Sequence, residues 1–196
     1  MRWIRYSEAK PWSNAVTRCV LPLTLAVTAP ASAREALVQN LTLPGNQNFI
    51  LQIDDGDHFT RLAVHMAIGG AFRRLASPAC GQIFTDFTDG KGRTLQENLD
   101  ATGQTAQAYL GLLRYANGAG QGPCARAGIL AFTSPGWRII HVCGGFRKKF
   151  LTLRLEERED LEIALLHEVL HTLGLGENPP TQEQITDQVR LRCHKR

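Results

Sequence analysis

The sequence lacks several features that mark common classes of protein. Its apolar stretch over residues 19–27 is too short to cross a bilayer as a helix. The formal net charge is only +4, and no basic stripe interleaved with aromatic residues is present, so we expect no nucleic-acid partner. A serine nucleophile elbow, a phosphate-binding loop and a dinucleotide fingerprint are all missing. These absences argue against serine hydrolases of that type and against nucleotide-dependent enzymes.

The size and composition are those of one globular domain. Of the 196 residues, 43% are hydrophobic and 20% are charged, which argues against a disordered, fibrous or multi-spanning protein. We expect a signal peptide over residues 1–33 and a single domain over residues 34–196, acting as a monomer.

The N-terminus has the pattern of an export signal. Basic residues lie among polar ones over residues 1–18, and the apolar stretch over residues 19–27 follows. Ala31-Ser32-Ala33 then offers a small-x-small cleavage pattern. This predicts cleavage after Ala33 and a secreted or periplasmic protein without stable membrane insertion. An uncleaved anchor or a buried helix is the alternative interpretation.

The cysteines agree with export. Cleavage after Ala33 would leave Cys80, Cys124, Cys143 and Cys193. Four cysteines in a secreted chain predict two disulfides, whereas free buried thiols are the alternative. A zinc site built from them is disfavoured, since no pair has Cys-x-x-Cys spacing. Three pairings are possible, and we expect Cys80–Cys124 with Cys143–Cys193.

Hydrophobic periodicity and turn residues predict an α+β domain. Helices are expected at residues 60–76, 104–115 and 156–173 and after an N-cap at Thr181, with Ile185, Val189 and Cys193 facing inward. Strands are expected at residues 35–43, 49–53 and 82–87, the last within a segment 77–103 that otherwise forms loops. Residues 128–133 and 137–143, joined by Ser134-Pro135-Gly136, predict a β-hairpin.

The segment His167-Glu168-Val169-Leu170-His171 carries the clearest chemical signal. Residues four apart share one helical face, so both imidazoles can reach a single zinc ion. Glu168 can act on a water molecule that zinc activates, and can later protonate a leaving amine. We therefore predict zinc-dependent hydrolysis of peptide bonds with Glu168 as the catalytic base. A pair of core histidines with an exposed glutamate is the alternative.

A catalytic zinc normally has three protein ligands, so one ligand is still missing. The candidates downstream are Glu177, Glu183, Asp187 and His194. We favour Glu177, because Gly174 can adopt a left-handed conformation that turns the chain back beneath the helix. A solvated loop residue is the alternative role for Glu177.

This pattern resembles the zincin metallopeptidases, and within them the metzincin layout His-Glu-x-x-His-x-x-Gly-x-x-(His/Asp). His167, Glu168 and His171 match it, Gly174 matches the glycine, and Glu177 occupies the third-ligand position. The stretch from Gly174 to Pro180 is also similar to small exported bacterial proteins. The resemblance covers about residues 161–180. It implies a zincin-like α+β domain with a mixed sheet, an edge-strand hairpin packed on the motif helix, and a peptide or protein substrate in a cleft along that strand.

The sequence departs from the family in three ways. Glutamate is unusual as the third metzincin ligand, the methionine turn is missing, and no tyrosine follows the motif. His141 is then a candidate for stabilising the oxyanion, with an ordinary strand residue as the alternative. A second functional hypothesis follows from these departures, namely a secreted, non-catalytic binding module with a structural zinc or none.

Overall fold

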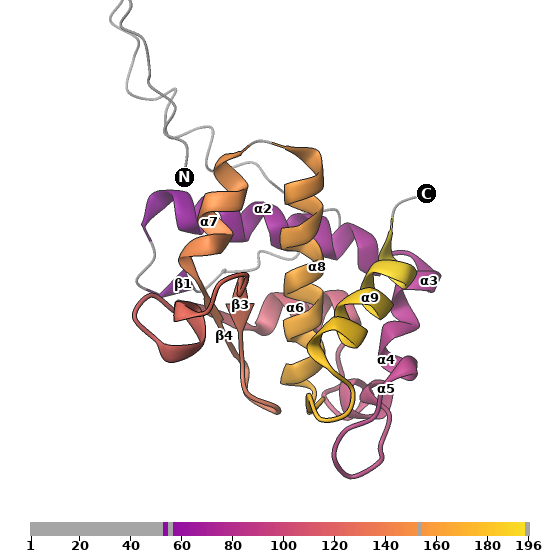
Figure 1. Cartoon of the computed structure of the whole chain (residues 1–196). Helices are drawn as coiled ribbons and strands as arrows, with labels where there is room; N and C mark the ends of the chain where they lie inside the picture. The colour runs from indigo at the N-terminus through magenta and orange to yellow at the C-terminus, as the bar shows by residue number, and fades with distance from the viewer. Residues whose placement is uncertain (1–52, 55–56, 153, 195–196) are drawn as a thin grey trace, which may run out of the picture. The chain divides into compact units, whose positions relative to one another are not determined.

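Two long helices cross at the centre of the fold, α2 (His58–Leu75) and α8 (Leu155–Thr172). The computed structural model describes residues 53–54, 57–152 and 154–194, and Figure 1 shows α2 running behind α8. All of these residues belong to one unit, Thr42–Arg196. The predicted signal peptide, the predicted strand at residues 35–43 and most of that at residues 49–53 lie outside the described residues.

Small side chains on α2 allow the two central helices to approach closely. Ala63, Ala67 and Ala71 recur every four residues on its buried face. The opposing face of α8 supplies larger side chains such as Leu161 and Leu165, both at most 1% exposed. The helix that carries the His-Glu-x-x-His motif therefore lies in the hydrophobic core, as its apolar pattern predicted.

The described strands form one mixed, four-stranded sheet in the order β1-β2-β4-β3. They are β1 (Ile53–Asp54), β2 (Arg114–Asn117), β3 (Ala131–Phe132) and β4 (Ile139–Val142). Strand β1 pairs parallel with β2, and β2 pairs parallel with β4, whereas β3 pairs antiparallel with β4. The predicted α+β class and the predicted hairpin are confirmed, and β3 is the edge strand beside α8.

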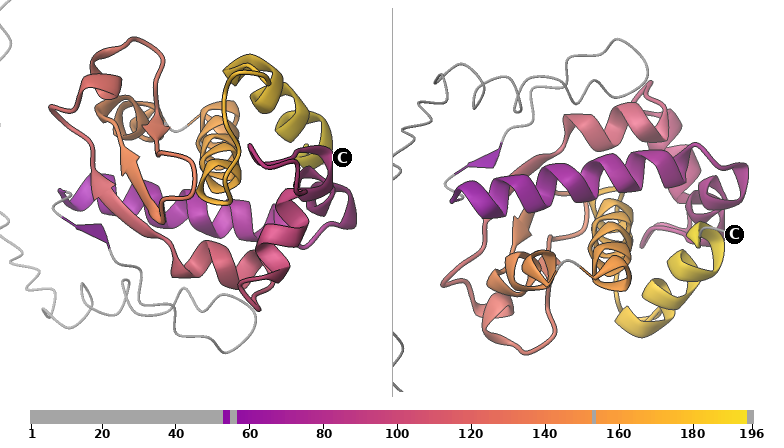
Figure 2. Two further views of the ribbon diagram at one scale, coloured as in Figure 1. Left: turned by 90° about the horizontal axis from the view of Figure 1, so that it is seen from below. Right: turned by 90° about the horizontal axis from the view of Figure 1, so that it is seen from above.

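The other described helices surround this centre. They are α3 (Pro78–Gly81), α4 (Ile83–Asp86), α5 (Leu95–Asp100), α6 (Ala106–Leu112), the 3-10 helix η1 (Gly122–Ala125), α7 (Gly144–Leu151) and α9 (Gln182–Cys193). Figure 2 looks along α8 and shows β3 and β4 on one side of it and α9 on the other.

The segment 77–103 was predicted incorrectly as loops with a strand at residues 82–87. Residues Ile83–Asp86 are helical instead, because the backbone N–H groups of Thr85 and Asp86 both donate to the Gln82 carbonyl. Helix α5 begins with a capping box in which Thr94 and Glu97 bond each other's backbone. That sequence signal was present but was outweighed by the surrounding turn-forming residues.

Strand β2 and helix α7 were not predicted. The helix predicted over residues 104–115 ends at Leu112, and the chain then enters β2 at the centre of the sheet. Tyr115 explains this change, since its side chain is fully buried in the hydrophobic core. In α7 the apolar signal consists of only Phe146 and Phe150, four residues apart and both buried.

Two disulfides are present, as predicted, but the predicted pairing is wrong. Cys80 bonds Cys193, and Cys124 bonds Cys143, with Cα–Cα distances of 4.4 and 5.2 Å. The first pairing arises because α9 packs against α3, which is distant in the sequence. The second arises because η1 packs against β3, the partner strand of β4 in the hairpin, and Cys143 directly follows β4. Neither proximity can be read from sequence spacing.

Helix α9 matches its prediction closely. Thr181 is the N-cap and forms a capping box with Gln184. Ile185, Val189 and Cys193 are all buried, as expected for residues four apart on one face. This helix packs along α8 and so forms one wall beside the motif.

Candidate metal centre

His167 and His171 lie one turn apart on α8 and point into the same small space. Both side chains are almost completely buried, with residue exposures of 4% and 3%. Their Nε2 atoms are 3.0 Å apart. The helix geometry therefore brings the two predicted ligands together, as four-residue spacing requires.

Glu177 completes a group of three possible ligands. Its Oε1 lies 3.2 Å from Nε2 of His171 and 3.9 Å from Nε2 of His167. Gly174, with φ of 107°, makes the turn that brings this carboxylate back to the helix. Among the residues that the structure describes, these three form the only group of three or more His, Cys, Asp or Glu side chains that could hold a metal ion.

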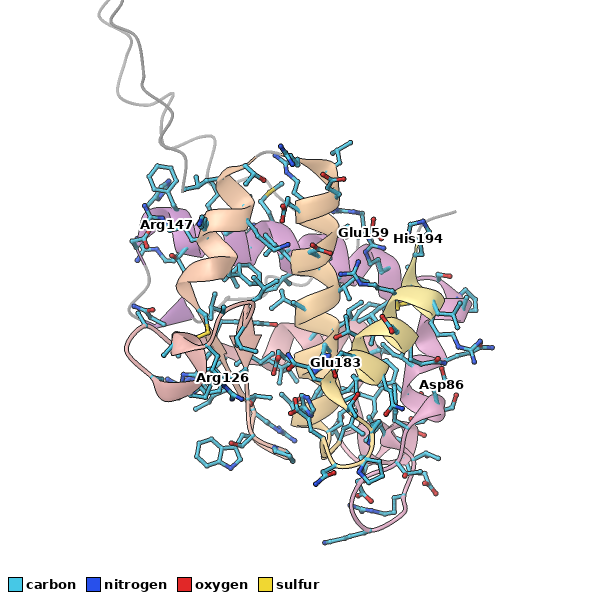
Figure 3. All side chains as sticks on the ribbon, viewed as in Figure 1. Asp86, Arg126, Arg147, Glu159, Glu183 and His194 are labelled. Carbon is cyan, nitrogen blue, oxygen red and sulfur yellow. A yellow bond between two sulfur atoms is a disulfide. The ribbon has the colours of Figure 1, made fainter. Side chains whose placement is uncertain are left out.

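The other third-ligand candidates are placed elsewhere or outside this group. His194 lies beside Glu159, with Nδ1 3.0 Å from Oε1, as Figure 3 shows near the end of α9. Glu183 and Asp187 are exposed on α9 and do not join the group. The geometry thus favours Glu177, the residue that sequence reasoning chose.

The separations between the three ligand atoms fit a zinc ion. Zinc binds nitrogen and oxygen at about 2.0–2.1 Å with tetrahedral angles, which places ligand atoms about 3.3–3.4 Å apart. The observed separations of 3.0, 3.2 and 3.9 Å bracket that value. Two imidazoles and a carboxylate are also a donor set that zinc accepts.

The orientation of His171 leaves a lone pair facing this space. Its Nδ1 donates to the Leu175 carbonyl at 2.8 Å, and a carbonyl can only accept, so Nδ1 carries the proton. When the ring is neutral, this proton on Nδ1 leaves an unprotonated Nε2 facing the Glu177 carboxylate. Two acceptors 3.2 Å apart repel each other unless a proton or a cation lies between them. A metal ion would resolve that conflict.

His167 is held in the neutral form that a metal ligand needs. Burial, together with the nearby His171, lowers the pKa of His167 to about 3. Its Nδ1 lies 3.0 Å from the Thr186 hydroxyl of α9. Sequence reasoning missed both outer contacts of the histidines, since a backbone carbonyl and a threonine on another helix leave no local signal.

Glu168 is a buried carboxylate with an unused oxygen. The residue is 7% exposed, Oε2 has no hydrogen-bond partner, and the backbone N–H of Thr133 faces the carboxylate. Burial raises the pKa of Glu168 to about 8, and the negative charge of Glu177 adds to this shift. A cation in the group would lower that pKa again, so ionised Glu168 and a bound metal favour each other.

The edge strand β3 presents free backbone groups beside Glu168. The N–H of Cys143 donates to the Leu130 carbonyl at 2.9 Å, so Leu130 faces β4. In an antiparallel pair, the backbone N–H and C=O groups of successive residues point alternately toward and away from the partner strand. Those of Ala131 and Thr133 therefore point away from β4. The position of the Thr133 N–H, which faces Glu168, agrees with that alternation.

A cavity of about 170 Å³ opens between β3, α8 and α9 at this point. His167, Glu168 and Ala131 line it, and Thr186 and Arg190 supply the wall from α9. Two larger cavities, of about 620 and 950 Å³, lie around the loop near Asp89, and their linings contain none of the residues His167, Glu168, His171 and Glu177. Cavity size by itself would therefore have pointed away from the metal group.

The turn after α8 is held by residues that the sequence did not mark. The Asn98 amide donates both to the Leu173 carbonyl at 2.9 Å and to Asp89 at 3.0 Å. On the other side, the backbone N–H of Gly136 in the hairpin turn donates to the His171 carbonyl at 2.9 Å. These contacts fix the path from His171 to Glu177.

The described contacts of His141 lie away from the metal group. Its ring stacks on Phe132 with centroids 4.9 Å apart, and Nδ1 lies 3.1 Å from the Gln121 amide. Tyr109 bonds Thr172, and Tyr115 bonds the Leu110 carbonyl. None of these contacts supports a role for His141, Tyr109 or Tyr115 in stabilising an oxyanion.

Comparisons of this chain with family models, with curated proteins and with solved structures find no match. Among the described residues, no helix is both long enough and apolar enough to cross a membrane. The functional assignment therefore depends on the geometry of the metal group and its surroundings.

Proposed function

We propose that this protein is a zinc-dependent peptidase of the zincin class. The observation that carries the proposal is the convergence of His167, His171 and Glu177 beside a buried glutamate with an unused oxygen. A mixed sheet whose edge strand lies beside the motif helix, with a second long helix behind it, supports the same class.

The residues of the site have distinct roles in this proposal. His167, His171 and Glu177 would hold the zinc ion, which when bound polarises a substrate carbonyl and makes water acidic near neutral pH. Glu168 would act as the base toward a water molecule through its free Oε2, and would pass the proton on to the leaving amine. The Thr133 N–H, which faces the Glu168 carboxylate, would help to orient it.

Strand β3 supplies a binding surface for an extended peptide. The outward backbone groups of Ala131 can pair with a substrate chain lying along the free edge, next to Glu168. Such pairing uses only backbone groups, so it suits peptide and protein substrates in general. The cavity between β3 and α9 can accept one substrate side chain.

A catalytic site is favoured over a purely structural one. Structural zinc sites have four protein ligands, whereas the described residues bring together three. The side chain of Glu177 is 54% exposed, so the group opens to solvent and to substrate. A non-catalytic module would also have no need for the buried Glu168.

We also propose that the protein acts in the periplasm or outside the cell. Its two disulfides support this, because such bonds persist in oxidising compartments.

Two glutamate substitutions test the function as a matched pair. Glu168→Gln should keep about one equivalent of zinc but lose at least about 10²–10⁴-fold in peptide hydrolysis, because only the base is removed. Glu177→Ala should lose zinc as well as activity. Zinc content is measured on purified protein, and hydrolysis is measured with a quenched fluorescent peptide library.

Two outcomes would contradict the proposal. One is a folded wild-type protein that holds less than about half an equivalent of zinc without chelator, since zinc sites bind tightly at neutral pH. The other is a Glu168→Gln variant as active as the wild type, which would remove the assigned base.

A further inference from the structure

The two histidines of the metal group are supported in different ways. Nδ1 of His171 donates to the carbonyl of Leu175, a backbone group four residues along its own chain segment. Nδ1 of His167 lies 3.0 Å from Oγ1 of Thr186, a side chain on a different helix. Only the second contact depends on a residue type and on how two helices dock.

Thr186 is held in place by the way in which α9 is anchored. Its neighbour Ile185 is fully buried, and the far end of the helix is bonded to α3 through Cys193 and Cys80. The guanidinium of Arg74 on α2 also donates to the Cys193 carbonyl. The hydroxyl of Thr186 therefore reaches His167 from a rigid support.

A threonine hydroxyl has the chemistry that this position needs. A histidine that binds metal through Nε2 must carry its proton on Nδ1, and that N–H needs an acceptor when it is buried. A hydroxyl can accept this hydrogen bond while donating its own proton to a carbonyl one turn back in its helix. A carboxylate would serve as well but would add a charge beside Glu168.

We propose that Thr186 is a positioning residue that sets the tautomer and the ring orientation of His167, so that the docking of α9 tunes metal affinity. This inference rests on the proposed zinc site. In the absence of the hydroxyl, the buried Nδ1–H of His167 loses its acceptor, and the tautomer protonated on Nε2, which cannot bind a metal, gains population.

The test compares Thr186→Val with Thr186→Ser. Valine keeps the shape of the side chain but cannot accept a hydrogen bond, whereas serine keeps the hydroxyl. Zinc dissociation constants are measured by competition with a chelator. Thr186→Val should weaken zinc binding about 10–100-fold, as loss of such outer contacts does. Thr186→Ser should stay within about threefold of the wild type.

Thr102→Val is the matched control for loss of a part-buried threonine hydroxyl. Its Oγ1 donates to the Leu99 carbonyl, and its residue is half-buried like Thr186 but lies outside the metal group. Its zinc affinity should remain within about threefold of the wild type, since a substitution away from the site has little effect.

Long-range ¹H–¹⁵N NMR of the histidine rings measures the tautomer of His167 directly. A merely structural role of Thr186 would leave that tautomer unchanged. In chelator-treated protein, the share of His167 in the Nδ1–H tautomer should be lower in Thr186→Val than in the wild type, because only the hydroxyl of Thr186 accepts from that N–H. Unchanged signals and unchanged zinc affinity in Thr186→Val would overturn the inference. So would Thr186→Ser behaving like valine.

The experiment separates this inference from the proposed function. A wild-type protein that binds no zinc would refute the zinc site, while the tautomer measured under chelator would still show whether Thr186 orients His167. A wild-type protein that binds zinc, with Thr186→Val binding it equally well, would refute only the positioning role.

Discussion

Substitution of Gly70 by alanine should destabilise the protein, although alanine is the better helix former. Gly70 lies in the middle of α2, and a Cβ atom built there would lie 2.0 Å from Oε1 and 2.1 Å from Cδ of Glu162 on α8. Glu162 would have to leave its position. It is the partner of the buried Arg74, whose Nε donates to Oε2 at 2.6 Å.

The magnitude follows from two opposing effects. Loss of one partner of a buried ion pair costs about 3–5 kcal/mol, because the remaining charge stays buried. Arg74 is 5% exposed and would keep the weaker contact to Glu159 at 3.3 Å. Replacing a helical glycine by alanine stabilises the helix by about 1 kcal/mol. The net loss in the free energy of unfolding is therefore about 2–4 kcal/mol.

Urea unfolding measures this loss, with Gly81→Ala as the control. A Cβ at Gly81, in α3, would meet nothing within 4 Å, so this substitution should be neutral or stabilising by up to about 1 kcal/mol. Melting temperature should fall by about 2–4 °C for each kcal/mol lost.

A double-mutant cycle with Glu162→Ala identifies the cause. Once the carboxylate is gone, Gly70→Ala should no longer destabilise, which gives a coupling of at least about 2 kcal/mol. The reasoning would be refuted if Gly70→Ala were as stable as the wild type, or if its cost were the same with and without Glu162.

Two further predictions concern stability. Replacing Cys80 and Cys193 by serine should cost about 4–5 kcal/mol, and replacing Cys124 and Cys143 about 3 kcal/mol, because the sequence separations are 113 and 19 residues. Urea unfolding of the two variants would contradict this if the order were reversed. The pKa of Asp89 is held well below its usual range by the Asn98 amide and by the backbone N–H groups of Arg93 and Lys91. Its contribution to stability is thus complete above the unfolded value near 3.8 and is lost as the pH falls toward the folded value. The difference in stability between wild type and Asp89→Asn should shrink below about pH 4, and a constant difference would exclude this linkage.

Local signals in the sequence determined the parts of the site that lie on one element. Four-residue spacing placed His167 and His171 on one face of α8, and Gly174 allowed the turn that returns Glu177 to them. The hairpin and the start and buried face of α9 were also readable, because turn residues, caps and periodicity act over a few residues.

Only the tertiary structure decided which distant segments meet. The disulfide pairing was mispredicted because it depends on α9 reaching α3, and the contact of Thr186 with His167 depends on the same docking. Gly70 lies in the middle of α2, where glycine is a poor helix former, yet it makes room for Glu162 of α8. Spacing along a chain constrains residues a few positions apart, whereas contacts between helices depend on how the whole core packs.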